Sequence, residues 1–76
     1  MDEALIAKIF GEELRKVREK AGISQERLAL EADVDRSFLS KMERGIRQPS
    51  LTVIFKLCSA LHYAPDKLIA DIHSRL

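Results

Sequence analysis

Hydrophobic residues recur every three or four positions along most of the chain, which is the spacing of an amphipathic helix. The first such series consists of Leu5, Ile6, Ile9, Phe10, Leu14, Val17 and Ala21. Gly22 follows directly, and a glycine in that position typically ends a helix. The pattern predicts a first helix over about residues 3–21. Gly11 inside it is a weak point, worth roughly 1 kcal/mol relative to Ala.

Residues that commonly cap helices divide the rest of the chain into four shorter helices. Ser24, Asp35 and Ser50 each precede an apolar-periodic segment, and their side-chain oxygens can accept hydrogen bonds from free backbone N–H groups. Pro65 suits the first position of the last helix. The predicted segments are about 25–32, about 36–44, the stripe Leu51, Ile54, Leu57, Cys58 and Leu61 after Ser50, and about 65–74. No segment alternates like a strand, so the sequence predicts an all-α fold of five helices.

Length and composition narrow the class of protein further. Seventy-six residues form one small domain with a thin core, which makes a large enzyme fold very unlikely. The single cysteine, Cys58, cannot form an internal disulfide, so we expect a reducing compartment and a buried thiol. No apolar run approaches the roughly 18 residues of a membrane span, and the first residues are acidic where a signal peptide is basic. These features predict a cytoplasmic protein.

Catalytic and metal-binding patterns are absent from the sequence. His62 and His73 have no partners at metal-ligand spacing, and Ser24 has no His or Asp arranged to activate it. No glycine-rich phosphate loop is present. We therefore expect a protein that is not an enzyme and that uses neither a cofactor nor a metal.

Charge points instead to the third helix. The formal net charge is only +1, but basic residues gather in two short blocks, 15–20 and 35–49. At about 100° per residue, one sector of the segment 36–44 contains only basic and hydroxyl side chains. Its members are Arg36, Ser37, Ser40, Lys41 and Arg44. Leu39 and Met42 lie opposite. Such a helix suits the major groove of DNA, although a solvated amphipathic helix is the alternative for this pattern alone.

The string SQERLALEADVDRSFLSKMERGIRQPSL, residues 24–51, resembles the helix-turn-helix family of phage Cro proteins and lambda-type repressors. The likeness extends over about residues 10–70 and leaves residues 1–9 outside it. One departure is Asp33, where the family's turn commonly has glycine, but Asp tolerates a left-handed backbone better than most residues. The resemblance implies a single five-helix DNA-binding domain over residues 1–76, with the helix-turn-helix at about 24–44.

The resemblance also implies roles for individual residues. The base-contacting positions correspond to Arg36, Ser37, Ser40 and Lys41. The phosphate-contacting positions correspond to Gln25, Phe38, Arg44 and Arg47. Arg18 and Glu43 match an ion pair that joins the first helix to the end of the third.

Binding to double-stranded DNA as a homodimer also follows from the resemblance, and the last helix is the expected interface. Its candidate residues are Tyr63, Leu68, Ile69, Ile72 and Leu76. Leu68 and Ile72 share one face, and exposed apolar patches commonly mark interfaces. Two alternatives stay open: these residues are simply core, or the interface lies at Leu5 and Ile6.

A transcriptional regulator that binds a palindromic operator and controls its own gene is the function that the resemblance implies. The strings DRSFLS, ERG and PSL further resemble controller proteins of restriction–modification systems. The alternatives are an antitoxin-like module that masks a partner protein and a helical domain without DNA affinity. The acids Glu26, Glu31 and Asp33 are either ordinary solvated side chains or a patch that contacts RNA polymerase.

Overall fold

Five helices account for all of the regular structure in the computed structural model, which describes residues 1–76. They are α1 (Glu3–Lys20), α2 (Gln25–Ala32), α3 (Arg36–Glu43), α4 (Leu51–Leu61) and α5 (Pro65–His73). The four ranges predicted from the sequence agree with these bounds to within one residue at each end. The predicted all-α fold class is therefore confirmed.

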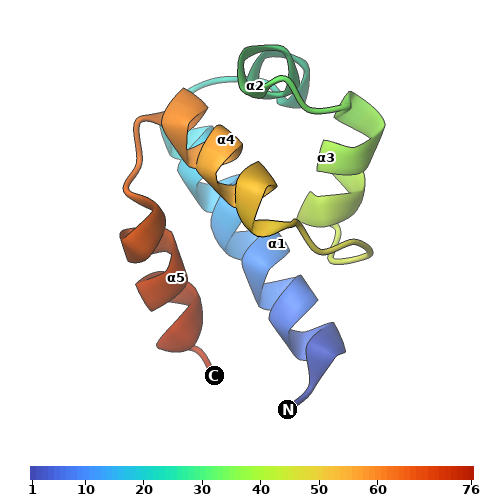
Figure 1. Cartoon of the computed structure of the whole chain (residues 1–76), viewed down its shortest axis with the longest axis vertical. Coiled ribbons are helices and arrows are strands. Elements are labelled where there is room, and N and C mark those ends of the chain that lie inside the picture. Colours follow the sequence, from blue (N-terminus) through green and yellow to red (C-terminus); the bar gives the residue numbers. More distant parts are fainter.

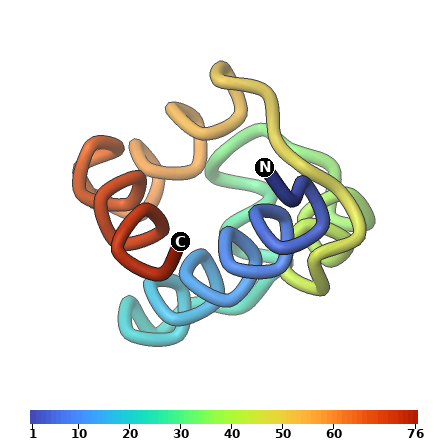
Figure 2. Tube along the Cα trace, turned by 90° about the horizontal axis from the view of Figure 1, so that it is seen from below, coloured from blue at the N-terminus to red at the C-terminus, as the bar shows by residue number.

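The long helix α1 contacts other helices on two of its sides. It packs against α3 on one side and α5 on the other, while α2 packs against α3 and α4. Figures 1 and 2 show α3 and α5 at opposite edges of the structure. Both chain termini lie at the same end, below α1 in Figure 1. This arrangement leaves the outer surface of α3 free of other helices.

Side-chain caps set the starts of most helices. Ser24, Asp35 and Ser50 each accept a hydrogen bond from the backbone N–H three residues further on, as the sequence predicts. Asp2 caps α1 in the same manner, which the sequence analysis missed. These bonds satisfy backbone donors that have no partner within the helix.

Two helices, α2 and α4, are each followed by a non-glycine residue whose backbone is in the left-handed conformation. Asp33 has φ 54° after α2, and His62 has φ 52° after α4. At Asp33 the left-handed turn is thus retained without the glycine that is common in the resembled family. Its backbone N–H donates to the Leu30 carbonyl, and the next N–H, of Val34, donates to Ala29. The turn between α2 and α3 is closed by these two bonds.

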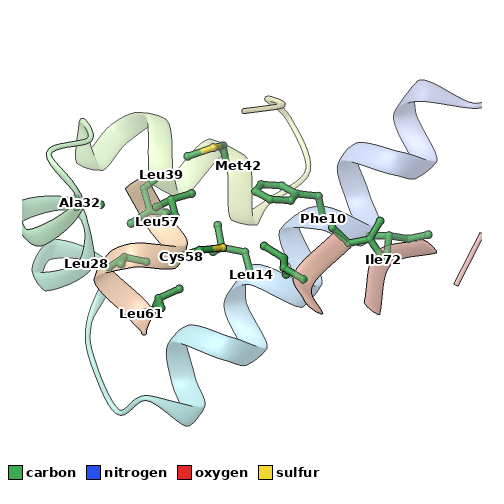
Figure 3. Close-up of a cluster of buried hydrophobic side chains, with 13 residues drawn as sticks. Phe10, Leu14, Leu28, Ala32, Leu39, Met42, Leu57, Cys58, Leu61 and Ile72 are labelled. Carbon is green, nitrogen blue, oxygen red and sulfur yellow. The ribbon is translucent and has the colours of Figure 1, made fainter. Parts of the chain in front are cut away.

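One hydrophobic cluster joins all five helices. Its largest fully buried side chains are Leu14, Leu28, Leu39, Met42, Leu57, Cys58 and Leu68. Figure 3 shows Cys58 in the middle of this cluster, with Phe10 and Ile72 together at one end. Cys58 is buried as predicted, and its burial raises the pKa of the thiol. Leu51, which the predicted stripe includes, does not belong to the core, because its side chain is 69% exposed.

Leu68 and Ile72, two of the residues predicted for the dimer interface, are also buried in the monomer. They lie on the face of α5 that closes the core against α1. This finding corrects the expectation that they are free to contact a second copy. Ile69 and Leu76 are about half exposed and remain available.

Tyr63 lies on the other flank of α5. Its ring borders a hollow that it shares with Val17 and Lys20 of α1, whereas Ile69 and Leu76 border a different groove. The hydroxyl donates to Asp71 Oδ2 at 2.6 Å, and this bond raises the pKa of Tyr63 to about 12. Tyr63 therefore stabilises the turn before α5 and does not join the surface formed by Ile69 and Leu76.

The carboxyl end of the chain is tied to α1 by Arg75. Its guanidinium donates to Glu12 Oε1 and to Glu13 Oε2, each at 2.6 Å. The hydrogen bond from Arg75 lowers the pKa of Glu12 below its usual value. These bonds hold the residues that follow α5 against the middle of α1.

Gly11 marks the place where α1 crosses the end of α3. A Cβ at this position would overlap the carbonyl oxygen of Met42 and come within 2.7 Å of the carbonyl oxygen of Glu43. The sequence analysis treated Gly11 only as a weak point of the helix. The structure instead requires a residue without a side chain here.

In Gly11→Ala, backbone atoms of α3 must shift to accommodate the methyl group, and this overpacking is expected to cost about 1–3 kcal/mol of the free energy of unfolding. The better helix propensity of Ala, worth about 1 kcal/mol, opposes this loss. Urea denaturation measures the difference. The pair Arg15→Gly and Arg15→Ala, at an exposed position of the same helix, gives the propensity contribution alone. A Gly11→Ala protein that gains as much stability over the wild type as Arg15→Ala gains over Arg15→Gly would contradict the close crossing.

Candidate nucleic-acid interface

Helix α3 is held against the core by one face. Leu39 and Met42 are fully buried, and Phe38 packs half-buried at the edge of the cluster. Arg36, Ser37 and Arg44 lie on the opposite side and are exposed. The two faces predicted from the helical periodicity are thus present in the structure.

Ser40 and Lys41 belong to the same outer sector but are half-buried. The chain folds back after α3, where the N–H of Ile46 donates to the carbonyl of Lys41 at 2.9 Å. The sequence analysis, which placed residues on an isolated helix, could not include this returning segment. The exposed part of the sector is therefore centred on Arg36, Ser37 and Arg44.

Phe38 does not fit the phosphate-contacting role that the resemblance implies. Its backbone N–H donates to Asp35 Oδ2 at 3.0 Å, and its ring packs against the core. Since the side chain has no donor, Phe38 has no free group for a phosphate oxygen. Its position reflects the capping of α3 instead.

Arg18, Glu43 and Gln25 form a buried network under α3. Arg18 Nε donates to Glu43 Oε2 at 2.6 Å, and Arg18 Nη2 donates to Glu43 Oε1 at 3.0 Å. The side chain of Glu43 is only 2% exposed and that of Arg18 is 11% exposed. The hydrogen bond to Glu43 raises the pKa of Arg18. The implied ion pair is thus present, and it joins α1 to the last turn of α3.

Gln25 extends this network to the start of α2. Its Nε2 donates to Glu43 Oε1 at 3.0 Å, and Arg18 Nη1 donates to the carbonyl of Ile23 at 2.9 Å. The amide of Gln25 has two donor hydrogens, so one remains after the bond to Glu43. The network therefore fixes the Gln25 side chain beside the free N–H groups at the start of α2.

The loop after α3 rests directly on α1. Gly45 has φ 76°, and a Cβ there would lie 3.0 Å from the Cα of Lys8. Further along the loop, Gln48 Nε2 donates to the carbonyl of Glu3 at 3.2 Å. These contacts hold the exposed residues Arg44 and Arg47 at the end of α3.

The basic residues of this surface differ in whether they have a carboxylate partner. Arg36 Nη1 lies 3.8 Å from Glu26 Oε2 of α2, whereas Lys41, Arg44 and Arg47 have no carboxylate partner within 4.0 Å. The pair between Arg36 and Glu26 was not foreseen, because sequence spacing does not show which residues of α2 and α3 face each other. The surface is thus predominantly cationic.

Exposed apolar side chains were also missed near the end of α2. Leu30 and Phe55 are exposed, and Phe55 borders a hollow with Glu31 and Asp33. Arg27 pairs with Glu31 at 2.6 Å, and Lys56 lies 3.9 Å from Asp33. The acids of α2 therefore have cationic neighbours and do not form an unpaired cluster.

A groove of about 320 Å³ lies between α1, α5 and the start of α4. Its lining is mainly apolar and consists of Ile6, Phe10, Gln48, Pro49, Ile54, Ile69, Ile72, His73 and Leu76. His62 and His73 are both exposed. Nowhere do three or more His, Cys, Asp or Glu side chains come together as a metal site. None of the helices combines the length and apolarity needed to cross a membrane.

Comparison with known proteins identifies the family. Residues 14–68 match the family model described as Helix-turn-helix, which covers more than half of the chain. The chain belongs to the helix-turn-helix family. Control protein C.BamHI of Bacillus amyloliquefaciens is 42% identical over 62 residues, which cover 80% of this chain and 76% of that protein. Control protein C.MunI of Mycoplasma sp is 39% identical over 64 residues, covering 83% and 86%.

A solved structure agrees with this assignment. The restriction-modification controller protein C.AhdI from Aeromonas hydrophila is 44% identical, with a TM-score of 0.79 over 82% of this chain and 94% of that chain. The implied family resemblance is confirmed. The predicted function is also confirmed at a general level: the protein is a DNA-binding transcriptional regulator and not an enzyme.

Proposed function

We propose that this helix-turn-helix protein binds a palindromic operator as a homodimer and controls its own gene together with a restriction–modification operon. The observation that carries the proposal is the outward face of α3, which presents basic and hydroxyl side chains on a helix anchored by its opposite face. The similarity to C.BamHI, C.MunI and C.AhdI, which are named as control or controller proteins, supports the restriction–modification role. Such a regulator acts on DNA in the cytoplasm.

Base recognition is assigned to Arg36, Ser37, Ser40 and Lys41. Arg36 and Ser37 begin α3 and are exposed, which suits contact with base edges by the first turn of a recognition helix. An Arg that donates two hydrogen bonds to guanine O6 and N7 distinguishes that base pair from the others. Arg36 is therefore the residue with the largest expected effect on specificity.

Phosphate contacts are assigned to Gln25, Arg44 and Arg47. Arg44 and Arg47 are exposed and free of carboxylate partners, so both can meet the DNA backbone. The remaining amide hydrogen of Gln25 and the free N–H groups of the first turn of α2 suit a phosphate oxygen. These contacts position α3 but carry little sequence information.

The dimer interface is proposed at the apolar groove between α1, α4 and α5, with a second copy of the chain as the occupant. Ile69 and Leu76 border the groove and are 48% and 53% exposed. Leu51 adds exposed apolar surface at the start of α4. A twofold dimer would present two α3 helices about one DNA turn apart, roughly 34 Å, to the two halves of a palindrome.

Contact with RNA polymerase is proposed at the surface of Leu30, Glu31, Asp33 and Phe55, where exposed apolar side chains accompany acidic ones.

An antitoxin-like role is the alternative function. It would use a partner protein in place of the second copy, and failure to bind any promoter fragment would favour it.

Arg36→Ala is expected to cost about 1–3 kcal/mol of binding free energy at the operator and much less on random DNA, because it removes a base contact. Arg47→Ala should instead weaken binding to all sequences alike and reduce the salt dependence, since each neutralised phosphate contributes a slope of about 0.9 in log affinity against log salt. Gel-shift titrations on both kinds of duplex at several salt concentrations measure these effects. Equal losses for Arg36→Ala on operator and random DNA would remove it from the base-reading set.

A further inference from the structure

The pair between Glu26 and Arg36 is the one place where a carboxylate reaches the proposed DNA-reading face of α3. Arg36 Nη1 lies 3.8 Å from Glu26 Oε2, and the two side chains are 63% and 78% exposed. Among the basic residues of that face and its following loop, Arg36 alone has such a partner. Glu26 is in the first turn of α2, directly after Gln25, which is a proposed phosphate contact.

A carboxylate in this position repels the DNA backbone. The nearby free N–H groups at the start of α2 and the side chains of Arg44 and Arg47 attract phosphate, whereas Glu26 opposes it. Glu31 also lies on α2, but its partner is Arg27 of the same helix. Glu26 therefore lowers affinity for DNA of any sequence unless the contact with Arg36 compensates for it.

We propose that Glu26 is a specificity-determining residue that acts by positioning Arg36; this inference rests on the proposed function. A guanidinium has five N–H donors in a fixed fork. Because the contact with Glu26 is through Nη1, at 3.8 Å, the Nε and Nη2 hydrogens stay available for another planar acceptor pair, such as O6 and N7 of guanine. Glu26 thereby selects one orientation of a side chain that is otherwise free to rotate in solvent.

Discrimination follows from the difference between matched and unmatched sites. At the operator, Arg36 contacts guanine while it still neutralises Glu26, so the carboxylate costs little. On other sequences, Arg36 either leaves Glu26 to reach a phosphate or stays with Glu26 and forms no DNA contact. In the first case Glu26 loses its partner, and in the second the complex lacks the contact between Arg36 and DNA, so either outcome disfavours the wrong site. As the interface excludes water, the attraction within the pair also strengthens.

A structural role is the competing explanation, because an acidic residue in the first turn of a helix is favourable there. That role predicts a change in thermal stability without a change in sequence preference. Glu31→Gln is the matched control, since it removes one negative charge from the same helix without touching Arg36.

The experiment compares wild type, Glu26→Gln, Glu31→Gln, Arg36→Ala and the double variant Glu26→Gln/Arg36→Ala. Each binds a duplex that the wild type has enriched from a random pool, and a scrambled duplex of the same composition, at one salt concentration. We expect Glu26→Gln to lower the ratio of the two affinities about tenfold, mainly by tighter binding to the scrambled duplex, which is in the lower part of the range for one Arg–guanine contact. Glu31→Gln should change both affinities by the same factor.

The double variant makes the mechanism testable. If Glu26 acts through Arg36, Glu26→Gln leaves the ratio unchanged in the Arg36→Ala protein. An equal ratio for Glu26→Gln and Glu31→Gln, or the same loss with and without Arg36, would overturn the inference and leave the proposed function intact. A wild type that shows no preference for any enriched duplex would overturn the proposed function and this inference with it.

Discussion

Glu43→Gln is expected to lower the free energy of unfolding by about 3–5 kcal/mol, because it leaves the buried charge of Arg18 without its counter-ion. Glu43 accepts three hydrogen bonds, two from Arg18 and one from Gln25. Gln has the same size but replaces one acceptor oxygen by a donor NH2 group. At least one of those donors would then face another donor in a site with almost no access to water.

The size of this loss matters in a chain of 76 residues. At about 0.05–0.15 kcal/mol per residue, the whole domain is stable by only about 4–11 kcal/mol. The substitution could therefore unfold a large fraction of the protein at ordinary temperature. Urea denaturation at fixed protein concentration measures the effect, since dimerisation also contributes to apparent stability.

Glu19→Gln is the matched control. Glu19 also pairs with an arginine, Arg15, but both side chains are more than half exposed. Exposed pairs contribute at most about 1 kcal/mol, so this variant should remain close to the wild type. A Glu43→Gln protein that unfolds at the same urea concentration as Glu19→Gln would show that the pair between Arg18 and Glu43 is not buried in solution.

A double variant distinguishes the loss of one charged partner from the loss of the whole ion pair. Replacing Arg18 by Met and Glu43 by Leu together removes both charges and keeps apolar volume, and such exchanges are often neutral or stabilising. We expect this double variant to be more stable than Glu43→Gln alone. The buried charge of Arg18 remains in Glu43→Gln and is removed in the double variant, so the comparison reports the cost of that stranded charge.

The elements of this fold could be predicted because their determinants are local. Ser24, Asp35 and Ser50 each act through a backbone N–H three residues away, and helical spacing identifies Leu39 and Met42 as the inner face of α3. A helix cap or a periodic apolar stripe can be recognised in the sequence without knowing how the helices pack. For this reason the helix bounds and the outward side of α3 were accessible from the sequence.

The features that sequence analysis missed depend on which helices meet. The bond from Gln25 to Glu43 spans two helices, and the bonds of Arg75 join the last turn of the chain to α1. In the sequence, Gly11 cannot be distinguished from any other glycine that weakens a helix. The need for glycine at this position comes from the close crossing of α1 and α3. Residue spacing within one segment contains no information about such contacts.

The same limit explains the revision of the dimer surface. Periodicity places Leu68 and Ile72 on an apolar face of α5, but it does not distinguish a face buried in the monomer from one buried between copies. The structure assigns these two residues to the core and leaves Ile69 and Leu76 at its edge. The proposed interface is consequently smaller on α5 and includes Leu51 and other residues of α4.

Ile69→Asp is expected to convert the proposed dimer into a folded monomer and to weaken operator binding by about 10²–10⁴-fold, because the two half-sites are then bound independently. In a twofold interface, one substitution introduces two carboxylates, one from each copy. Each would lose its hydration without a partner, which disfavours association strongly. The monomer should tolerate the change, since Ile69 is already about half exposed in it.

Sedimentation equilibrium and gel-shift titration measure these two consequences, and circular dichroism checks that each variant is folded. Ala70→Asp is the control: it adds the same charge to the neighbouring position of α5, which is exposed and does not line the groove. Leu76→Asp tests the same surface at a second position. If Ile69→Asp and Leu76→Asp both remain dimers that bind the operator as tightly as Ala70→Asp, the interface lies elsewhere. The exposed side chain of Leu5 on α1 would then be the next position to substitute.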